Sequence, residues 1–123
     1  MRVLAAEDDP SMREAIRRLL RIAGHDCTTF ASAEALLESG EWVRAECVVT
    51  DLNLPRMSGL ELLDELRRRR DDLLPVVVIT AFDKPGLREQ TLGRGVAAYL
   101  TKPFEGSALL DAIRDTCGLG RAN

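Results

Sequence analysis

Short apolar segments alternate with longer amphipathic segments along the whole chain. In the longer segments apolar residues recur every three or four positions, which is the spacing of helices packed on one face. Five strands alternating with five helices predict a (βα)5 domain of the α/β class, with a parallel sheet, right-handed crossovers and helices on both faces. No linker, repeat or low-complexity segment interrupts the pattern, so we expect residues 1–123 to form one domain. The predicted strands are 3–6, 27–30, 47–50, 76–80 and 96–100.

Local signals mark where some helices begin. Asp9 followed by Pro10 predicts an N-cap and first turn after the first strand. Ser58 and Glu61 form an S-x-x-E capping box before the third helix. The helix predicted over residues 85–95 is the weakest, because it has two large apolar residues and two glycines near its end.

Composition excludes several classes of protein. The 123 residues include 17 Lys and Arg against 20 Asp and Glu, a net charge of -3, so direct nucleic-acid binding by this chain is not expected. No apolar run approaches the ~20 residues of a membrane span, and no signal peptide is evident. Three cysteines without a CxxC motif and a single histidine argue against zinc or a disulfide framework, which favours a reducing cytoplasm.

Polar residues with chemical potential stand where the predicted strands end. Glu7 and Asp8 follow the first strand, Asp51 the third, Thr80 ends the fourth and Lys102 follows the fifth. Ligands of open parallel sheets bind at these carboxyl ends. We therefore expect three carboxylates, one hydroxyl and one ammonium group to meet at one edge of the sheet.

A divalent cation would relieve the repulsion between three neighbouring carboxylates. Oxygen ligands without His or Cys favour Mg²⁺. We expect Asp8 and Asp51 to be direct ligands, helped by the backbone carbonyl of Asn53. Glu7 would reach the metal directly or through its water shell.

A metal beside an aspartate also prepares the site for phosphoryl transfer, because it neutralises the incoming group while one carboxylate acts as nucleophile. Lys102 would place a positive charge on the phosphoryl oxygens, and the Thr80 hydroxyl would donate a hydrogen bond to them. The sequence thus predicts chemistry of the acyl-phosphate type.

Together these motifs resemble the receiver domain of bacterial two-component response regulators. The resemblance covers essentially the full chain, with five motifs in the expected order at the strand ends. It implies a flavodoxin-like, doubly wound sheet of order 2-1-3-4-5 and a cis bond between Lys102 and Pro103. The motifs are Glu7-Asp8-Asp9-Pro10, the segment Asp51 to Gly59, Thr80-Ala81, and Tyr99-Leu100-Thr101-Lys102-Pro103-Phe104.

The resemblance also implies function. Asp51 would accept a phosphoryl group from a histidine kinase or phosphotransfer protein, in an Mg²⁺-dependent reaction. Lys102 would bind the phosphate, and Thr80 with Tyr99 would form a switch acting on the surface of the fourth helix, fifth strand and fifth helix. Such a domain is a signalling switch that catalyses only its own phosphorylation and dephosphorylation. Its output is expected to be transcription through a DNA-binding domain outside this chain, and phosphorylation-dependent homodimers are common in the family.

Two positions and several alternatives stay open. Glu7 replaces the Asp usual in the family, which bears on metal affinity, and we expect bulky Phe82 to shield a phosphoaspartate from water. A hydrolase of the haloacid dehalogenase type would need a second acid two residues after Asp51. Asn53 occupies that position, which argues against this alternative. Two alternatives remain: a receiver that works without phosphate, and a relative of flavodoxin. The second is disfavoured because no Gly-rich loop follows the first strand. The run Arg67–Arg70 is interpreted as a solvated helix end.

Overall fold

A computed structural model describes residues 1–81 and 83–121, and the side chains as far as residue 116. Five parallel strands form one sheet in the order β2-β1-β3-β4-β5, which confirms the predicted class and strand order. The strands are β1 (Arg2–Ala6), β2 (Asp26–Phe30), β3 (Cys47–Asp51), β4 (Val76–Thr80) and β5 (Ala98–Thr101). The helices are α1 (Pro10–Ile22), α2 (Ala33–Ser39), the short 3-10 helix η1 (Glu41–Val43), α3 (Gly59–Arg69), α4 (Leu87–Leu92) and α5 (Gly106–Arg121).

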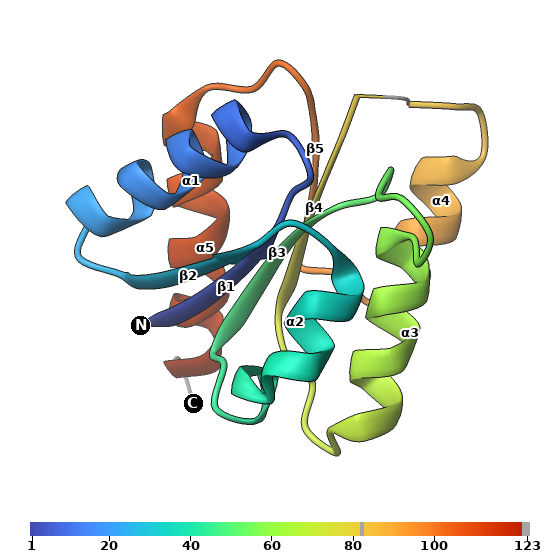
Figure 1. Ribbon diagram of the computed structural model, residues 1–123, viewed down its shortest axis with the longest axis horizontal. Helices are drawn as coiled ribbons and strands as arrows, with labels where there is room; N and C mark the ends of the chain where they lie inside the picture. Colours follow the sequence, from blue (N-terminus) through green and yellow to red (C-terminus); the bar gives the residue numbers. More distant parts are fainter. Residues whose placement is uncertain (82, 122–123) are drawn as a thin grey trace.

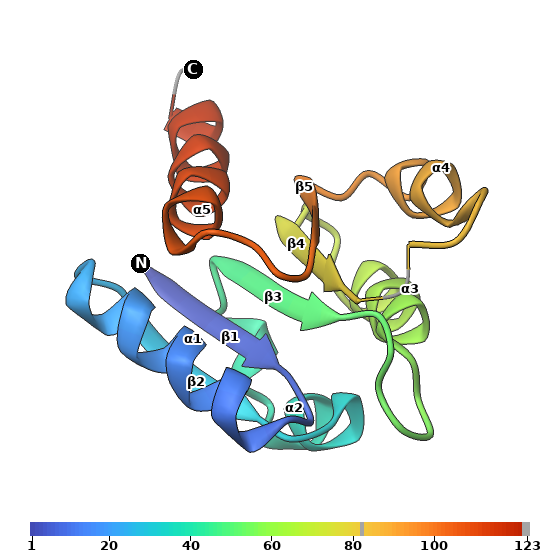
Figure 2. The same ribbon diagram turned by 90° about the horizontal axis from the view of Figure 1, so that it is seen from above.

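Helices cover both faces of the sheet (Figures 1 and 2): α1 and α5 lie on one face, and α2, α3 and α4 on the other. The alternation of side chains along each strand explains the two cores. Val3 of β1 joins the apolar cluster under α1 and α5, whereas its neighbour Leu4 joins the cluster under α2 and α3. Of the helices in the described ranges, none has the length and apolar character needed to cross a membrane.

The predicted starts of the first and third helices are confirmed. The Asp9 side chain accepts a hydrogen bond from the backbone N–H of Met12, as expected of an N-cap. Both halves of the capping box between Ser58 and Glu61 are present, at 3.2 and 2.9 Å. These caps fix where α1 and α3 begin, immediately after the loops that follow β1 and β3.

The prediction of the fourth helix and fifth strand was wrong at their ends. The α4 helix spans six residues rather than the whole of 85–95. Gly86 has a φ of +84° and Gly95 a φ of +78°, so each takes a left-handed conformation that closes a turn and cannot continue a helix. The turn at Gly95 also delays the fifth strand, which starts at Ala98 instead of residue 96.

The interpretation of Arg67–Arg70 as a solvated helix end was wrong for its first and last residues. Arg67 donates hydrogen bonds to the carbonyl of Leu74, at 2.5 Å, and to that of Gly95, at 3.2 Å. Arg70 likewise donates to carbonyls preceding β3, while Arg68 and Arg69 are exposed as expected. The half-buried arginines therefore tie α3 to neighbouring loops.

Gly59 permits the close approach of α3 to the end of β3. A Cβ atom at this position would lie 2.2 Å from the backbone oxygen of Asp51 and 2.7 Å from the Cα of Leu52. The Gly59 N–H donates to the carbonyl of Leu52 at 3.0 Å, so the backbone cannot move away without losing that bond. A residue without a side chain is thus required where the helix meets the loop after Asp51.

We predict that Gly59→Ala lowers the free energy of unfolding by about 3 kcal/mol, because the added methyl group overlaps backbone atoms that cannot rotate aside. Urea denaturation measures the change. Gly106→Ala is the matched control, since its Cβ would meet the flexible side chain of Leu19 at 3.3 Å. Equal stability of the two variants would contradict this account of Gly59.

Candidate functional site

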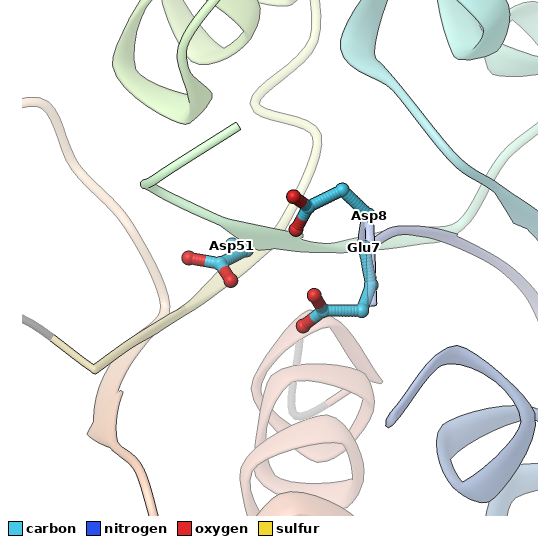
Figure 3. Close-up of side chains that lie close together, drawn as sticks. All are labelled: Glu7, Asp8 and Asp51. Atoms are coloured by element: carbon cyan, nitrogen blue, oxygen red, sulfur yellow. The ribbon is translucent and has the colours of Figure 1, made fainter. Parts of the chain in front are cut away.

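Three carboxylates meet at the carboxyl edge of the sheet, as the strand-end pattern predicts. Oxygen atoms of Glu7, Asp8 and Asp51 all lie within 4.8 Å of one another. Figure 3 shows the three side chains turned toward a common space, Glu7 and Asp8 from the end of β1 and Asp51 from the end of β3. Glu7 and Asp51 are buried, with 1% and 4% of their surface exposed, whereas Asp8 is exposed.

Lys102 reaches into this group from the loop after β5. Its Nζ donates to Glu7 Oε1 and to Asp51 Oδ2, each at 2.8 Å. The backbone N–H of Lys102 donates to the carbonyl of Thr80 at 2.8 Å, which anchors the start of the loop. The peptide bond from Lys102 to Pro103 is cis, as the resemblance implied.

Backbone groups hold the remaining carboxylate oxygens. Asp51 Oδ1 accepts from the N–H of Asn53 at 2.9 Å, and Glu7 Oε2 accepts from the N–H of Asp9 at 3.0 Å. Arg13 of α1 donates to the backbone carbonyl of Glu7 at 3.0 Å and braces the loop from outside. The carboxylates of Glu7 and Asp51 are therefore fixed in orientation before any ligand arrives.

The electrostatics reflect one half-buried ammonium shared by two buried carboxylates. Burial raises the pKa of Glu7 above its ordinary value, and the hydrogen bond from Lys102 opposes this rise only in part. Burial alone would lower the pKa of Lys102, but its bonds to Asp51 and Glu7 outweigh that effect, so the Lys102 pKa is raised. Lys102 thus stays charged and partly compensates the carboxylates.

This donor set fits a hard divalent cation. The site has three carboxylates and a single ammonium group, that of Lys102, so its net charge is negative. Each carboxylate offers an oxygen ligand. Oxygen-only ligands suit Mg²⁺. Asp9 is directed instead to the N-terminus of α1, in agreement with its predicted role as a cap.

Asn53 and Thr80 line a cleft of about 370 Å³ between the loops that follow β3 and β4. The Asn53 side chain is exposed and Thr80 is 1% exposed at the end of β4. Thr80, the predicted hydroxyl donor, thus lies at the end of β4, and the neighbouring strand β3 ends with Asp51. The other lining residues are Leu52, Ser58, Leu60, Lys84 and Leu87.

Tyr99 lies on the same face of the sheet as Thr80, because Tyr99 pairs with Val78 and side chains two residues apart share a face. Its ring is 7% exposed and packs in the core under α2 and α3. The hydroxyl donates to Asp83 Oδ1 at 2.9 Å, and the guanidinium carbon of Arg88 lies 5.2 Å from the ring centroid. The tyrosine is thus held by residues on both sides of the turn into α4.

Sequence reasoning missed three supporting residues: Arg13, Asp83 and Glu34. The first braces the acidic loop, the second holds the Tyr99 hydroxyl, and Glu34 bonds to the loop after β3. Each is a polar residue in a helix or loop, and no pattern in the neighbouring sequence predicts which residue it contacts. The expected shielding role of Phe82 lies outside the described residues.

A doubly wound parallel sheet with an acidic pocket and a lysine at its carboxyl edge defines a receiver-type α/β domain. The sequence matches the response regulator receiver domain family over residues 3–114, and the chain belongs to that family. It is 38% identical over 112 residues to the response regulator protein FleR of Pseudomonas aeruginosa, covering 91% of this chain and 24% of FleR.

Other relatives agree. The chain is 37% identical to the transcriptional regulatory protein FixJ of Azorhizobium caulinodans, covering 91% of this chain and 53% of FixJ. A solved response regulator receiver protein from Burkholderia phymatum is 34% identical with a TM-score of 0.80, covering 95% of this chain and 94% of that one. The chain therefore spans a quarter to about half the length of FleR and FixJ, and nearly all of the solved receiver protein.

We predict that Lys102→Met lowers the free energy of unfolding by about 3 kcal/mol at neutral pH, because two buried carboxylates then face each other without a cation. Urea denaturation checks this. Adding Glu7→Gln in the Lys102→Met background should restore part of the loss by removing one charge. A loss that is unchanged in the double variant would show that the repulsion between carboxylates is not the cause.

The single tyrosine gives a second prediction. Burial, with the hydrogen bond to Asp83 as the next cause, raises the pKa of Tyr99 to about 12. The stabilisation linked to this shift is fully present below the ordinary value of 10.0 and is lost as pH rises through about 12. Tyrosinate absorbance, followed with circular dichroism, should titrate accordingly.

In Asp83→Asn the pKa of Tyr99 should fall but stay above its ordinary value, since burial remains. Asp111→Asn, an exposed substitution in α5, serves as control and should leave the Tyr99 titration unchanged. An ordinary tyrosine pKa in the folded wild-type protein would refute the buried position of this ring.

Proposed function

We propose that this domain is the phosphoacceptor switch of a two-component signalling system, and that Asp51 accepts the phosphoryl group from a histidine kinase or a phosphotransfer protein. The observation that carries the proposal is the shared Lys102 ammonium, 2.8 Å from both Asp51 and Glu7, whose carboxylates also lie close to that of the exposed Asp8. A pocket of this kind has a nucleophile, a charge that binds phosphate and oxygen ligands for a cation.

In the proposed transfer, a carboxylate oxygen of Asp51 attacks the phosphorus atom of phosphohistidine. The O–P bond forms as the P–N bond breaks, and the imidazole leaves with the bonding electron pair and takes up a proton. The Asp51 side chain is oriented for this step by the N–H of Asn53 and by Lys102. Lys102 then stays with the phosphoryl oxygens, which carry the negative charge.

Bound Mg²⁺ would supply charge neutralisation at the phosphoryl oxygens. Asp8 and Asp51 would hold it directly, with the backbone carbonyl of Asn53, and Glu7 would contribute through a water molecule. The existing bonds of Glu7 to Lys102 and to the N–H of Asp9 support this indirect part. The longer side chain of Glu7, compared with Asp, thus fits a role in holding Lys102 in place.

The proposed switch runs from Thr80 to Tyr99. The Thr80 hydroxyl would turn to a phosphoryl oxygen on Asp51, and the change would reach Tyr99 through the loop that contains Asp83. The neighbouring α4 helix has six residues and leaves Leu92 42% exposed, so it is weakly packed. Elements with few buried apolar contacts move at low free-energy cost. The surface of α4, β5 and α5 is the proposed output face.

The output that we propose is control of transcription through a DNA-binding domain outside this chain. FixJ, one of the relatives, is a transcriptional regulatory protein, and this chain covers 53% of its length. The charge of -3 disfavours direct DNA contact by the domain itself. In this proposal the domain changes the activity of an attached or associated partner and does no chemistry beyond its own phosphorylation and dephosphorylation.

The direct test is incubation with acetyl phosphate and Mg²⁺, followed by intact-mass measurement. We expect the wild-type mass to increase by one phosphoryl group, and Asp51→Asn to show no increase because its amide is not a nucleophile. Asp111→Asn, which changes an exposed carboxyl group, should be labelled like wild type.

The remaining outcomes separate the alternatives. Rapid, repeated release of inorganic phosphate would favour a hydrolase, and absence of any adduct on the wild-type protein would favour a receiver that works without phosphate. Labelling that persists in Asp51→Asn would contradict the assignment of Asp51.

A further inference from the structure

Glu34, in the first turn of α2, crosses to the loop that follows the proposed phosphoacceptor. Its Oε2 accepts hydrogen bonds from the backbone N–H of Met57, at 3.3 Å, and from Nε of Arg56, at 3.2 Å. Its own backbone N–H, then that of Met57 and the Arg56 guanidinium, lower the pKa of Glu34, so the group is ionised at neutral pH. One carboxylate thus joins α2 to two consecutive loop residues.

The other oxygen shows that this carboxylate is not a simple surface group. Glu34 Oε1 is buried and has no hydrogen-bond partner among the described residues. Burying such an atom without a partner is unfavourable, so the other contacts of the side chain must outweigh that cost. The bonds of Oε2 to the loop are those contacts.

The loop needs such a contact because of its backbone conformation. Arg56 has a φ of +64°, and it is the one non-glycine residue with positive φ within the described ranges. A side chain disfavours this conformation, which therefore persists only when neighbouring groups hold it. Glu34 bonds to the side chain of that same residue and to the N–H of the next one.

The opposite end of the loop is fixed by the site itself. Asp51 Oδ1 accepts from the N–H of Asn53, and five residues, 53–57, then lead to the contact with Glu34. Immediately afterwards the capping box at Ser58 and the close approach of Gly59 to Asp51 return the chain to β3. The path of this short loop is therefore set by Asp51 at one end and by Glu34 at the other.

We propose that Glu34 is a positioning residue of the acidic site: by holding Arg56 and Met57 it sets the direction of the Asn53 carbonyl relative to Asp51, and so the affinity for the cation. This inference rests on the proposed function, which assigns the cation to Asp8, Asp51 and the Asn53 carbonyl. Supporting groups that orient metal ligands typically change affinity 10–100-fold when they are removed.

The alternative is an ordinary ion pair that contributes only a little stability. The Arg56 side chain is 69% exposed, and exposed pairs contribute little to folding. The two interpretations differ in one readout: an ordinary ion pair affects unfolding alone, whereas a positioning residue changes Mg²⁺ affinity in the folded protein.

The experiment measures Mg²⁺ binding directly, by calorimetry or by amide chemical shifts, in wild type, Glu34→Ala and Glu34→Gln. We expect Glu34→Ala to weaken binding about 10-fold. Glu34→Gln should fall between wild type and Glu34→Ala, because its amide oxygen still accepts from the Met57 N–H but the charge facing Arg56 is gone. Glu38→Ala, an exposed change on the same helix, should bind like wild type.

A second measurement separates affinity from chemistry. With acetyl phosphate as donor, Glu34→Ala should need more Mg²⁺ for half-maximal labelling but reach a similar rate at saturating Mg²⁺. Wild-type affinity in both Glu34 variants overturns the inference, whatever their stability, and leaves Asp51 as phosphoacceptor intact. A wild-type protein that binds no Mg²⁺ overturns the proposed function as well, so the two failures are distinguishable.

Discussion

The shared ammonium group of Lys102 is the interaction on which the arrangement of the site depends. It compensates two buried carboxylates that come from different strands, Glu7 after β1 and Asp51 at the end of β3. Without it, the two charges would be desolvated side by side, at a cost of several kcal/mol. With Asp8 added, the pocket has more negative than positive charge, and this imbalance favours a divalent cation.

The backbone around the pocket is built to keep these charges together. Gly59 lets α3 approach the carbonyl of Asp51, Arg13 braces the carbonyl of Glu7, and Glu34 holds the far end of the loop after β3. Each contact comes from a different helix packed on the sheet. The site is therefore a product of the whole fold, since the parallel strands deliver the charged groups and the helices fix the loops that carry them.

Much of the fold was accessible from sequence because its signals are local. The caps at Asp9 and Ser58 and the apolar run of β4, residues 76–79, are recognisable from residue type and spacing. The ends of α4 and β5 were missed because the sequence does not show whether a glycine such as Gly86 has a negative or a positive φ. The role of Arg67 was missed for another reason, because its carbonyl partners, 7 and 28 residues away, lie in loops outside its helix and no local pattern marks them.

The site shows the same division. Asp8, Asp51 and Lys102 were predictable because the carboxyl ends of parallel strands converge at one edge, and the resemblance to receiver domains reinforced each position. Glu34 and Asp83 were not, because one bonds from α2 to a loop and the other from a loop to Tyr99 in β5, so both contacts depend on how the elements pack in space. Sequence therefore predicted the charged groups that meet at the edge of the sheet, and the structure added those that hold them.

The most direct test of the central claim is an NMR titration with Mn²⁺, a paramagnetic ion that shares the preference of Mg²⁺ for oxygen ligands. The account predicts that substoichiometric Mn²⁺ broadens the amide signals of residues 7–9 and 51–53 and of Lys102, and that Asp8→Asn removes this broadening. Broadening that is scattered over exposed carboxylates such as Asp26, or that survives in Asp8→Asn, would contradict it.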